Sequence, residues 1–425
     1  MITREPDLVE GMKLEQRVPP LPPAPIEIPT VGGQPIYLSD ERLGQHVLLV
    51  GSIGQGKTNT AYHILAGVRA TMREEDIAVV FDPKGDYLSR FRRAGDIVIN
   101  DPDGPKDQDP WNLVDELRAS SEDPEETLNE IAHTLFDEAI EQSQQPFFPI
   151  AAKDLFAAVL AHLASSEGTT NASIRSYWDT KSREEILSDL QKNAATRGLT
   201  NYIGLEGQQS LGVLGHVSQL VHDVFVGRFR QPGDLSLRNA VRRRGGRCIF
   251  IEYRISTGKA LAPVYKVLVD LAIKEALSAG LNRGRVFMFI DEFRLLPRLL
   301  HMDHGVNFGR EFGMRFVVGM QSQAQVRAAY GDEAESILSG FNTVFSFRVT
   351  NADTRAFIKG ITGQNKKRVA IPRLVSGPPV EEIVDGYVVE DHHICDLCPG
   401  RAIVFTPGYN PFVTQIALYD GRNGR

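Results

Sequence analysis

The sequence predicts an α/β protein in which a parallel sheet is interrupted by an inserted all-α domain. Short apolar runs alternate with amphipathic stretches from about residue 45 to residue 100, which is the strand–helix–strand rhythm of a parallel sheet. The same alternation returns from residue 247 to residue 406. Between residues 112 and 234 the patterns are helical, and no run reads as a convincing strand. One α/β domain therefore resumes after a helical interruption.

The expected elements follow from these patterns. We predict strands over residues 46–50, 77–81, 97–100, 247–253, 285–291, 315–321, 343–350 and 401–406. We predict helices over residues 58–71, 259–279, 322–330 and 352–361, and the insertion adds helices that begin near residue 123 and cover residues 150–164 and 182–192. The proline-rich stretch 18–29 should form an extended polyproline-type arm, with the ordered domain beginning after it.

Composition excludes several classes of protein. Three cysteines in 425 residues argue against a disulfide framework and for a reducing compartment. No uninterrupted apolar stretch approaches the ~18 residues of a membrane span, so we expect a soluble, cytoplasmic chain. A net charge of −7 gives no global attraction to nucleic acid, so any contact with DNA must come from local basic positions.

A phosphate-binding loop follows the first predicted strand. Its sequence fits the GxxxxGK[ST] pattern, lies after an apolar strand and precedes a helical pattern, which is the context that this motif requires. The backbone N–H groups of such a loop surround phosphates, the lysine reaches the terminal phosphates and the threonine holds Mg²⁺. The predicted nucleotide-binding residues are Gly51, Ser52, Ile53, Gly54, Gln55, Gly56, Lys57 and Thr58.

Polar residues follow three other predicted strands. Asp291 and Glu292 end the apolar run that starts at residue 286, so we expect Asp291 to bind Mg²⁺ and Glu292 to be the general base that activates water. Gln321 follows another strand, which would bring its amide close to the acidic pair if the two strands are neighbours, and it is predicted to sense the terminal phosphate. A helix-capping Gln-Ser turn is the alternative interpretation. Asp82 and Lys84 follow the second strand and are further candidates for the nucleotide site, although a Pro-Gly turn explains them equally well.

Three more clusters have open interpretations. The basic stretches 238–247 and 366–368 are candidate phosphate contacts or solvated faces. His392, His393, Cys395 and Cys398 have a spacing that could supply metal ligands, but no second ligand pair lies at the usual distance. A turn into the final strand is the simpler interpretation of that segment.

The motifs together resemble a known family, the type IV secretion coupling proteins of the TraD, TraG and TrwB kind, within the FtsK/HerA group of ring-forming DNA pumps. The resemblance covers about residues 43–406 and is carried by the segment 82–91, by 289–293, by Gly309 and Arg310, and by 319–325. It implies a RecA-like P-loop motor domain, ATP and Mg²⁺ as cofactors, and Arg310 as a finger that enters the neighbouring subunit's site. The alternative for Arg310 is an ion pair with a nearby acid on an exposed helix. Members of the family usually begin with membrane-spanning helices, whereas this sequence begins with the proline-rich arm.

From motif and resemblance we predict a nucleotide-binding domain over residues 36–111 and 235–425, an inserted domain over 112–234 and an N-terminal arm over 1–35. The resemblance implies an ATP-driven DNA translocase that works as a ring, expected to be a hexamer, without sequence preference. It also implies a membrane or relaxosome protein as a partner, which would hold the chain peripherally at the inner membrane. A HerA-like motor for DNA processing or defence, and an assembly ATPase that acts on protein, remain as alternatives.

Overall fold

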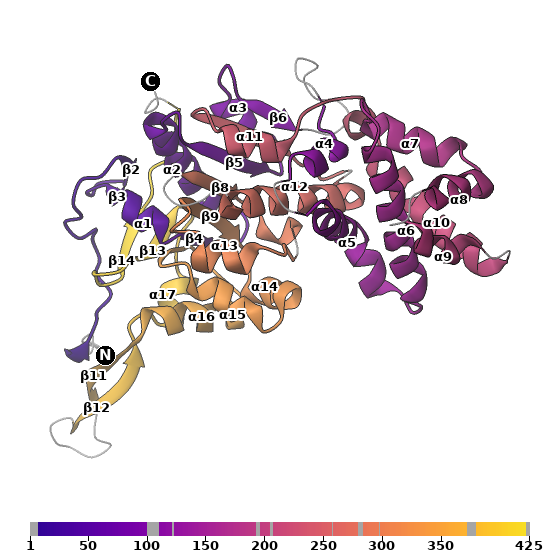
Figure 1. Cartoon of the computed structure of the whole chain (residues 1–425). Coiled ribbons are helices and arrows are strands. Elements are labelled where there is room, and N and C mark those ends of the chain that lie inside the picture. Colours follow the sequence, from indigo (N-terminus) through magenta and orange to yellow (C-terminus); the bar gives the residue numbers. More distant parts are fainter. Residues whose placement is uncertain are drawn as a thin grey trace. The chain divides into compact units, whose positions relative to one another are not determined.

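The computed structural model describes residues 7–99, 110–120, 123–192, 196–204, 207–256, 258–278, 284–296, 298–371 and 380–421 (Figure 1). The chain forms two compact units. The first unit, called the P-loop unit here, contains Met1–Arg73, Phe287–Pro297 and Asp303–Arg425. The second, called the insertion unit, contains Glu74–Val286 and Arg298–Met302. The domain boundaries expected near residues 35, 111 and 234 stay a prediction.

The sheet of the P-loop unit surrounds one short buried strand, β4 (Val47–Val50). The strand order is β14 (Phe412–Gln415), β13 (Arg401–Phe405), β10 (Thr343–Ser346), β4, β9 (Met314–Met320) and β8 (Val286–Ile290). β4 pairs in parallel with β10 on one side and with β9 on the other. Each residue of β4 is buried, because the strand is central and both of its faces are covered.

Helices follow these strands where the sequence predicted them, with boundaries that differ by at most one residue. α2 (Lys57–Thr71) follows β4, α14 (Gln323–Tyr330) follows β9, and α16 (Ala352–Thr362) follows β10. The remaining helices of this unit are α1 (Asp40–Gly44), α13 (Met302–Phe308), α15 (Glu333–Ser339) and α17 (Asp391–Cys395). Strand β10 ends at Ser346, four residues before the predicted end.

The expectation that the ordered domain begins after residue 29 is wrong. Within the proline-rich stretch, β2 (Ile26–Ile28) pairs with β3 (Ile36–Leu38), and its isoleucines are buried. Ile26 packs against Gly67 on α2 so closely that a side chain at residue 67 would collide with it. The prolines flank this strand rather than fill it, so its N–H groups remain able to pair.

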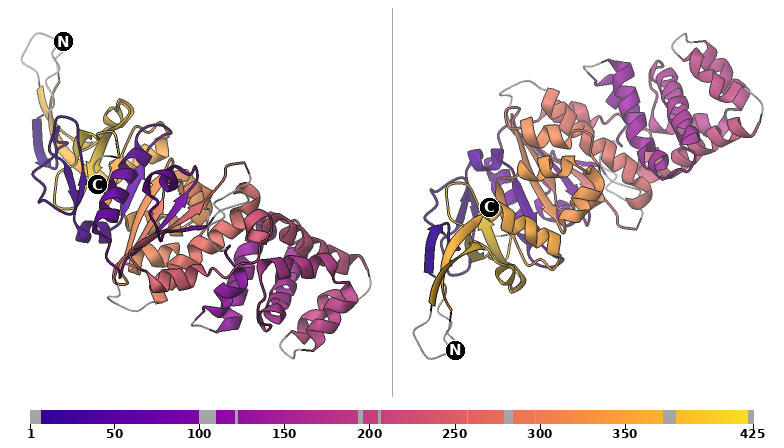
Figure 2. Two further views of the ribbon diagram at one scale, coloured as in Figure 1. Left: turned by 90° about the horizontal axis from the view of Figure 1, so that it is seen from above. Right: turned by 90° about the horizontal axis from the view of Figure 1, so that it is seen from below.

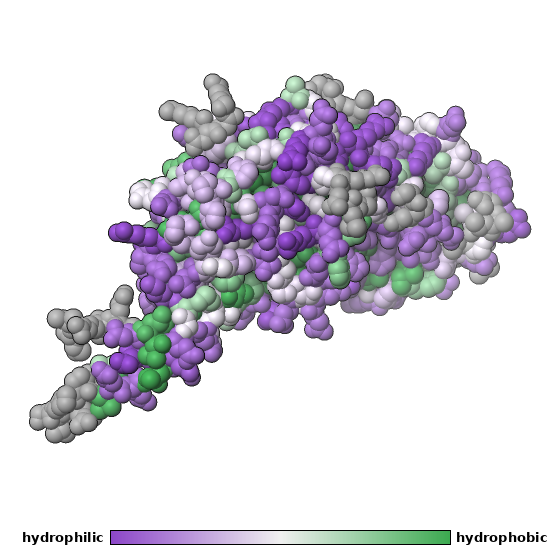
Figure 3. All heavy atoms as spheres, turned by 60° about the vertical axis from the view of Figure 1, so that its left-hand side comes forward, coloured by the Kyte–Doolittle hydropathy of each residue, from purple (hydrophilic) through white to green (hydrophobic). Residues whose placement is uncertain are grey.

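A further sheet of the P-loop unit was not predicted. β1 (Asp7–Gly11) pairs with β11 (Gln364–Ile371), which pairs with β12 (Val380–Tyr387). Apolar side chains are exposed on both outer strands, among them Leu8, Val9 and Ile383, and Figure 3 shows apolar atoms gathered there. The strands are polar and charged for most of their length, so sequence patterning did not single them out.

The insertion unit combines a small parallel sheet with helices. β7 (Arg247–Glu252) lies between β5 (Ile77–Asp82) and β6 (Ile97–Ile99) and is parallel to both. Residue 100 of the predicted third strand and residue 279 of a predicted helix lie outside the described residues. The helices are α3 (Asp86–Phe91), α4 (Leu113–Arg118), α5 (Pro124–Gln142), α6 (Phe147–Ala164), α7 (Asn171–Thr180), α8 (Arg183–Gln191), α9 (Asn201–Gly204), α10 (Gln208–Val224), α11 (Leu237–Arg243) and α12 (Gly258–Ser278).

The predicted insertion is helical. The described residues between 113 and 234 contain α-helices and short 3₁₀ turns but no β-strand, and Figure 2 shows these helices gathered in one bundle. Within the described chain, α6 is the one helix with the length and composition to cross a membrane, and half of it is buried. It packs against α5 and α10 and buries Leu155 and Phe156, as a core helix does.

Ion pairs join α12 to α5, a helix of the predicted insertion. The ammonium of Lys266 lies 2.8 Å from Asp137, and Lys274 pairs with Glu130, both carboxylates belonging to α5. Lys266 and Lys274 are eight residues apart and therefore lie on one face of α12. This face of the helix is held to α5 by buried charges as well as by apolar packing.

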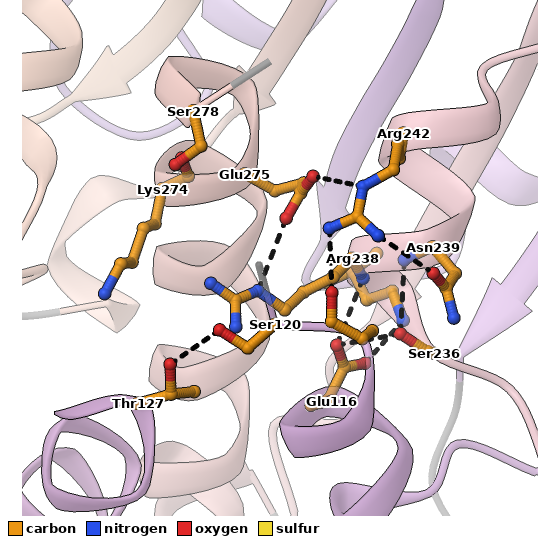
Figure 4. Close-up of polar contacts among 12 residues, drawn as sticks. Glu116, Ser120, Thr127, Ser236, Arg238, Asn239, Arg242, Lys274, Glu275 and Ser278 are labelled. Atoms are coloured by element: carbon orange, nitrogen blue, oxygen red, sulfur yellow. Dashed lines mark hydrogen bonds and ion pairs between the residues drawn. The ribbon is translucent and has the colours of Figure 1, made fainter. Parts of the chain in front are cut away.

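Glu116 is a fully buried carboxylate of the insertion unit, with no exposed surface. It accepts hydrogen bonds from the Trp111 indole (2.7 Å), the Ser236 hydroxyl (3.1 Å) and the backbone N–H groups of Leu237 and Arg238. Figure 4 shows how this network joins α4 to the start of α11, where Arg238 also meets Glu275 of α12. Burial raises the pKa of Glu116, and the four donors oppose that rise.

We expect Glu116→Ala to lower the free energy of unfolding by about 3 kcal/mol or more, because four buried donors would lose their acceptor at once. Chemical denaturation followed by circular dichroism measures this loss. Glu126→Ala on α5 is the matched control, since Glu126 is exposed, and it should change stability by less than about 0.5 kcal/mol. Equal stability of the two variants would contradict the structural role of Glu116.

Candidate active site

The phosphate-binding loop connects the carboxyl end of β4 to the start of α2. Gly56 precedes the helix in a left-handed conformation with φ of 118°, and no side chain caps the helix. The first N–H groups of α2 are therefore available to an anion. The Lys57 ammonium lies inside the loop and donates hydrogen bonds to the carbonyls of Gly51 (2.7 Å) and Ser52 (3.1 Å).

Residues next to the ends of β10 and β13 pack against the loop and form backbone hydrogen bonds with it. A Cβ atom at Gly51 would lie 2.7 Å from the Cβ of Phe347, which follows β10, so the close packing requires glycine. The N–H of Ser52 donates to the carbonyl of Arg348 (2.9 Å), and the N–H of Gly400 donates to the carbonyl of Gln55 (2.8 Å). The middle of the loop stands free, with Ile53 73% exposed and Gly54 in the left-handed region at φ 74°.

The acidic pair follows β8, two strands away from the loop. The hydroxyl of Thr58 donates to a carboxylate oxygen of Asp291 at 2.7 Å. A hydroxyl and a carboxylate at this separation are oxygen ligands of the kind that Mg²⁺ takes alongside nucleotide phosphates and water. Thr58 and Asp291 therefore fit a shared magnesium site, and the expected pairing of loop and acid is present in the folded chain.

Gln321 lies beside the second acid, as the sequence predicted. Its amide donates to one carboxylate oxygen of Glu292 at 2.7 Å, and the Arg294 guanidinium lies 3.1 Å from the other. Gln321 directly follows β9, the strand between β4 and β8. The side chains at the ends of these strands thus converge on one edge of the sheet. Sequence reasoning missed Arg294, because nothing in its pattern distinguishes it from a solvated residue.

Comparison with known proteins supports one family. A family model described as the type IV secretion-system coupling protein DNA-binding domain matches residues 28–370. The chain belongs to the type IV secretion-system coupling proteins. Coupling protein TraD of Escherichia coli (strain K12) is 24% identical over 348 residues, which cover 79% of this chain and 46% of TraD. This coupling-protein chain thus spans about half the length of that relative.

Solved structures share the fold. The conjugative coupling protein TrwBdeltaN70 in an unbound monoclinic form superposes with a TM-score of 0.77 at 20% identity, covering 98% of this chain and 95% of that one. TrwB in complex with the ATP analogue ADPNP gives a TM-score of 0.75 at 20% identity, covering 99% and 96%. VirB4 of Thermoanaerobacter pseudethanolicus gives 0.55 at 15% identity, covering 97% and 99%. The predicted RecA-like P-loop fold is confirmed.

Asp82 and Lys84 belong to the insertion unit of this coupling protein. Asp82 is fully buried at the end of β5 and accepts hydrogen bonds from the N–H groups of Leu88 (2.9 Å) and Lys84 (3.3 Å), so it shapes the turn into α3. Burial raises the pKa of its carboxyl. Lys84 is exposed. A role for either residue at the nucleotide stays a prediction.

Arg310 lies before β9, at the opposite end of that strand from Gln321. Seven residues of extended strand separate the two ends by ~20 Å, so Arg310 cannot reach the phosphate loop of its own chain. Its side chain is exposed, and no ion pair or hydrogen bond engages it among the residues that the structure describes. Sequence alone left pairing with a nearby acid open, and no such pair forms in the described chain.

Most of the basic side chains in the stretches 238–247 and 366–368 are buried or form ion pairs within the chain. Arg238 and Arg244 are buried, and Arg242 pairs with Glu275 at 2.8 Å. In the second stretch, Lys366 pairs with Glu10 at 3.0 Å and Lys367 with Glu390 at 3.0 Å. The hypothesis of phosphate contacts is therefore wrong for the buried arginines of the first stretch, because a buried guanidinium cannot meet a DNA backbone.

The cysteine and histidine segment forms α17 and the turn before β13. His393 accepts a hydrogen bond from the N–H of Glu390 at 3.0 Å and so helps to begin the helix. Within the described residues, no group of three or more histidine, cysteine or acidic side chains could hold a metal ion.

His46 precedes β4 and is nearly fully buried. Its Nε2–H donates to the Val306 carbonyl at 2.9 Å, and its Nδ1 accepts from the N–H of Phe316 at 3.1 Å. Burial lowers its pKa to about 4, despite the bond to Val306, and the nearby Arg315 and Arg310 lower it further. His46 is therefore neutral at neutral pH and joins the starts of β4 and β9.

We expect the free energy of unfolding to fall as the pH is lowered from about 6.5 to 4, because in this range the unfolded chain binds a proton at His46 and the folded chain does not. The stability that neutral His46 contributes is fully present above the ordinary histidine pKa and amounts to at most about 3 kcal/mol. Unfolding experiments across this range should show a shallower slope for His46→Gln, whose amide can replace both hydrogen bonds without titrating. His304→Gln at an exposed site should keep the slope. An unchanged slope in His46→Gln would contradict the assignment.

Proposed function

We propose that this chain is an ATPase that translocates DNA, as a conjugative coupling protein does. The observation that supports this most directly is the pair of contacts at one sheet edge, where Thr58 meets Asp291 and Gln321 meets Glu292, both at 2.7 Å. Binding needs the first pair and hydrolysis needs the second. TrwB structures in complex with ADPNP and with ADP and Mg²⁺ share the fold, which supports ATP and Mg²⁺ as the cofactors here.

The loop residues bind the phosphates. Backbone N–H groups from Gly51 to Thr58 would surround the phosphate chain, and the Lys57 ammonium would exchange its two carbonyl partners for phosphate oxygens. Thr58 and Asp291 would hold Mg²⁺, which neutralises charge on the phosphates. We also propose Asp82 and Lys84 as further nucleotide-binding residues.

Glu292 accepts the proton of the attacking water as general base. Gln321 and Arg294 hold its two carboxylate oxygens, so the carboxylate has a defined orientation before any substrate arrives. Gln321 would also report the presence of the terminal phosphate, since it lies on the strand between the loop strand and the acidic strand. A second acid next to the magnesium ligand favours hydrolysis over a simple nucleotide switch.

We infer that the active form is a ring, expected to be a hexamer, in which Arg310 completes the site of a neighbour. Strand β9 separates Arg310 from Gln321 by ~20 Å, so the exposed Arg310 is placed to act on another subunit rather than on its own site. DNA is the proposed substrate because the matching family model is described as a DNA-binding domain. With a net charge of −7, the chain would grip phosphates locally and without sequence preference.

The proposed organisation assigns residues 36–111 and 235–425 to the motor and residues 112–234 to the inserted helical domain. A membrane or relaxosome protein would bring the ring to the inner membrane and deliver its cargo.

We expect Glu292→Gln to retain ATP binding and lose hydrolysis by ~10²-fold or more, because the amide keeps the shape of the side chain but cannot take a proton. Lys57→Ala should instead weaken binding itself. Fluorescent-nucleotide titration and ATP turnover, each with and without double- and single-stranded DNA, separate the two effects. DNA should stimulate turnover of the unmodified chain. Normal turnover in Lys57→Ala would contradict the proposed ATPase, and turnover indifferent to DNA would contradict the proposed substrate.

We expect a mixture of Arg310→Ala and Glu292→Gln chains to recover activity that neither has alone. Some interfaces then contain an intact Glu292 beside an intact Arg310, and such fingers contribute ~10³–10⁵ in turnover. ATP turnover across mixing ratios is the measurement. Full activity of Arg310→Ala alone, or a stable mixed ring without recovery, would show that Arg310 is not the finger.

A further inference from the structure

Two exposed arginines stand beside the phosphate loop and are not used by the mechanism above. Arg348 follows β10, and Arg401 begins β13. In the antiparallel register of these strands, Ser346 opposes Ile403, and the same register continued for two residues past the end of β10 would place Arg348 opposite Arg401. Both arginines therefore lie at the edge of the sheet where the loop begins.

Backbone hydrogen bonds tie both positions to the loop itself. The carbonyl of Arg348 accepts from the N–H of Ser52 at 2.9 Å. Gly400, the neighbour of Arg401, donates its N–H to the carbonyl of Gln55 at 2.8 Å. The two arginines are thus fixed to the first and middle parts of the loop, rather than to a separate surface.

Neither guanidinium has an anionic partner. Both side chains are exposed, and within the described ranges no ion pair or side-chain hydrogen bond engages either of them. Several other cations of this unit are paired, among them Arg315 with Asp40 and Arg355 with Asp391. Two unpaired positive charges on facing strands repel each other, and a shared anion relieves that repulsion.

The strand order indicates which part of a bound nucleotide would lie near Arg348 and Arg401. β10 and β13 lie on one side of β4, whereas β9 and β8, which lead to Gln321 and to the magnesium ligand Asp291, lie on the other. The arginines therefore lie on the side of β4 away from Asp291, where we expect the end of the phosphate chain that is remote from the magnesium site. That end carries the phosphates common to ATP and ADP.

We propose that Arg348, supported by Arg401, binds the nucleoside-proximal phosphates of the nucleotide held in the same subunit. This inference rests on the proposed ATPase function and assigns to it a cation that acts in cis, in contrast to Arg310. Arginine suits the task because its planar fork can donate two hydrogen bonds to one phosphate.

Equilibrium titration with fluorescent ATP and ADP tests the assignment. Arg348→Ala should weaken both nucleotides by about 10- to 100-fold, since a charge-assisted hydrogen bond to a phosphate common to both is lost. The KM for ATP should rise while kcat stays within about twofold, because the contact is made equally in the ground and transition states. Arg348→Lys should retain part of the affinity. Arg401→Ala should act in the same direction and more weakly, from one strand further away.

Arg17→Ala is the matched control, because it removes an exposed arginine of the same unit that lies outside the loop region, and it should bind like the unmodified chain. At an ATP concentration well below the KM of the variant, mixing Arg348→Ala with Glu292→Gln chains should give no more turnover than the Arg348→Ala chains give alone, since every intact Glu292 would share its site with the missing arginine. Unchanged binding in Arg348→Ala, a loss confined to ATP, or recovery in the mixture would overturn the cis assignment. If the unmodified chain binds neither nucleotide, the proposed ATPase function fails first and this inference fails with it.

Discussion

The hydrogen bond between Thr58 and Asp291 is the contact on which the rest of the site depends. It joins the first turn of α2 to the end of β8, across the intervening strand β9. Such a contact forms only when the carboxyl ends of the strands are aligned at one edge of the sheet. Strand β4 fixes this alignment because its four buried residues are paired in register with both neighbouring strands. Gln321 and Glu292 meet because the same alignment applies to them.

Close packing below the loop has the same origin. Phe347 fills the space under Gly51 and Gly56, and the turn at Gly400 supports the loop from the neighbouring strand β13. The phosphate loop is therefore held from beneath, while its centre at Ile53 and Gly54 remains open to a ligand. A preorganised loop of this kind binds phosphate without first paying to order its backbone.

The insertion unit uses charge where the P-loop unit uses apolar packing. Glu116 and Glu275 are enclosed, and each is surrounded by donors or guanidinium groups. Buried ionic groups add little net stability compared with apolar residues, but a broken pair is costly. We infer that these contacts define how α4, α11 and α12 fit together, since only one arrangement satisfies all the partners.

The sequence by itself determined the α/β fold, the loop at residues 51–58, the acids at 291–292 and the helical insertion. These features rest on local chemistry, such as the glycines that a tight loop needs and the apolar runs that a buried parallel strand needs. Tertiary structure alone decided that Ile26 packs on α2, that Arg238 is buried on Glu275, and that β1 pairs with β11. It also decided that Arg310 and Gln321 lie at opposite ends of β9, and that the backbone of Arg348 and that of Gly400, the neighbour of Arg401, are hydrogen-bonded to the loop. Partners distant in sequence leave no periodic signal, because a side chain's pairing and burial depend on which strands the fold places next to each other.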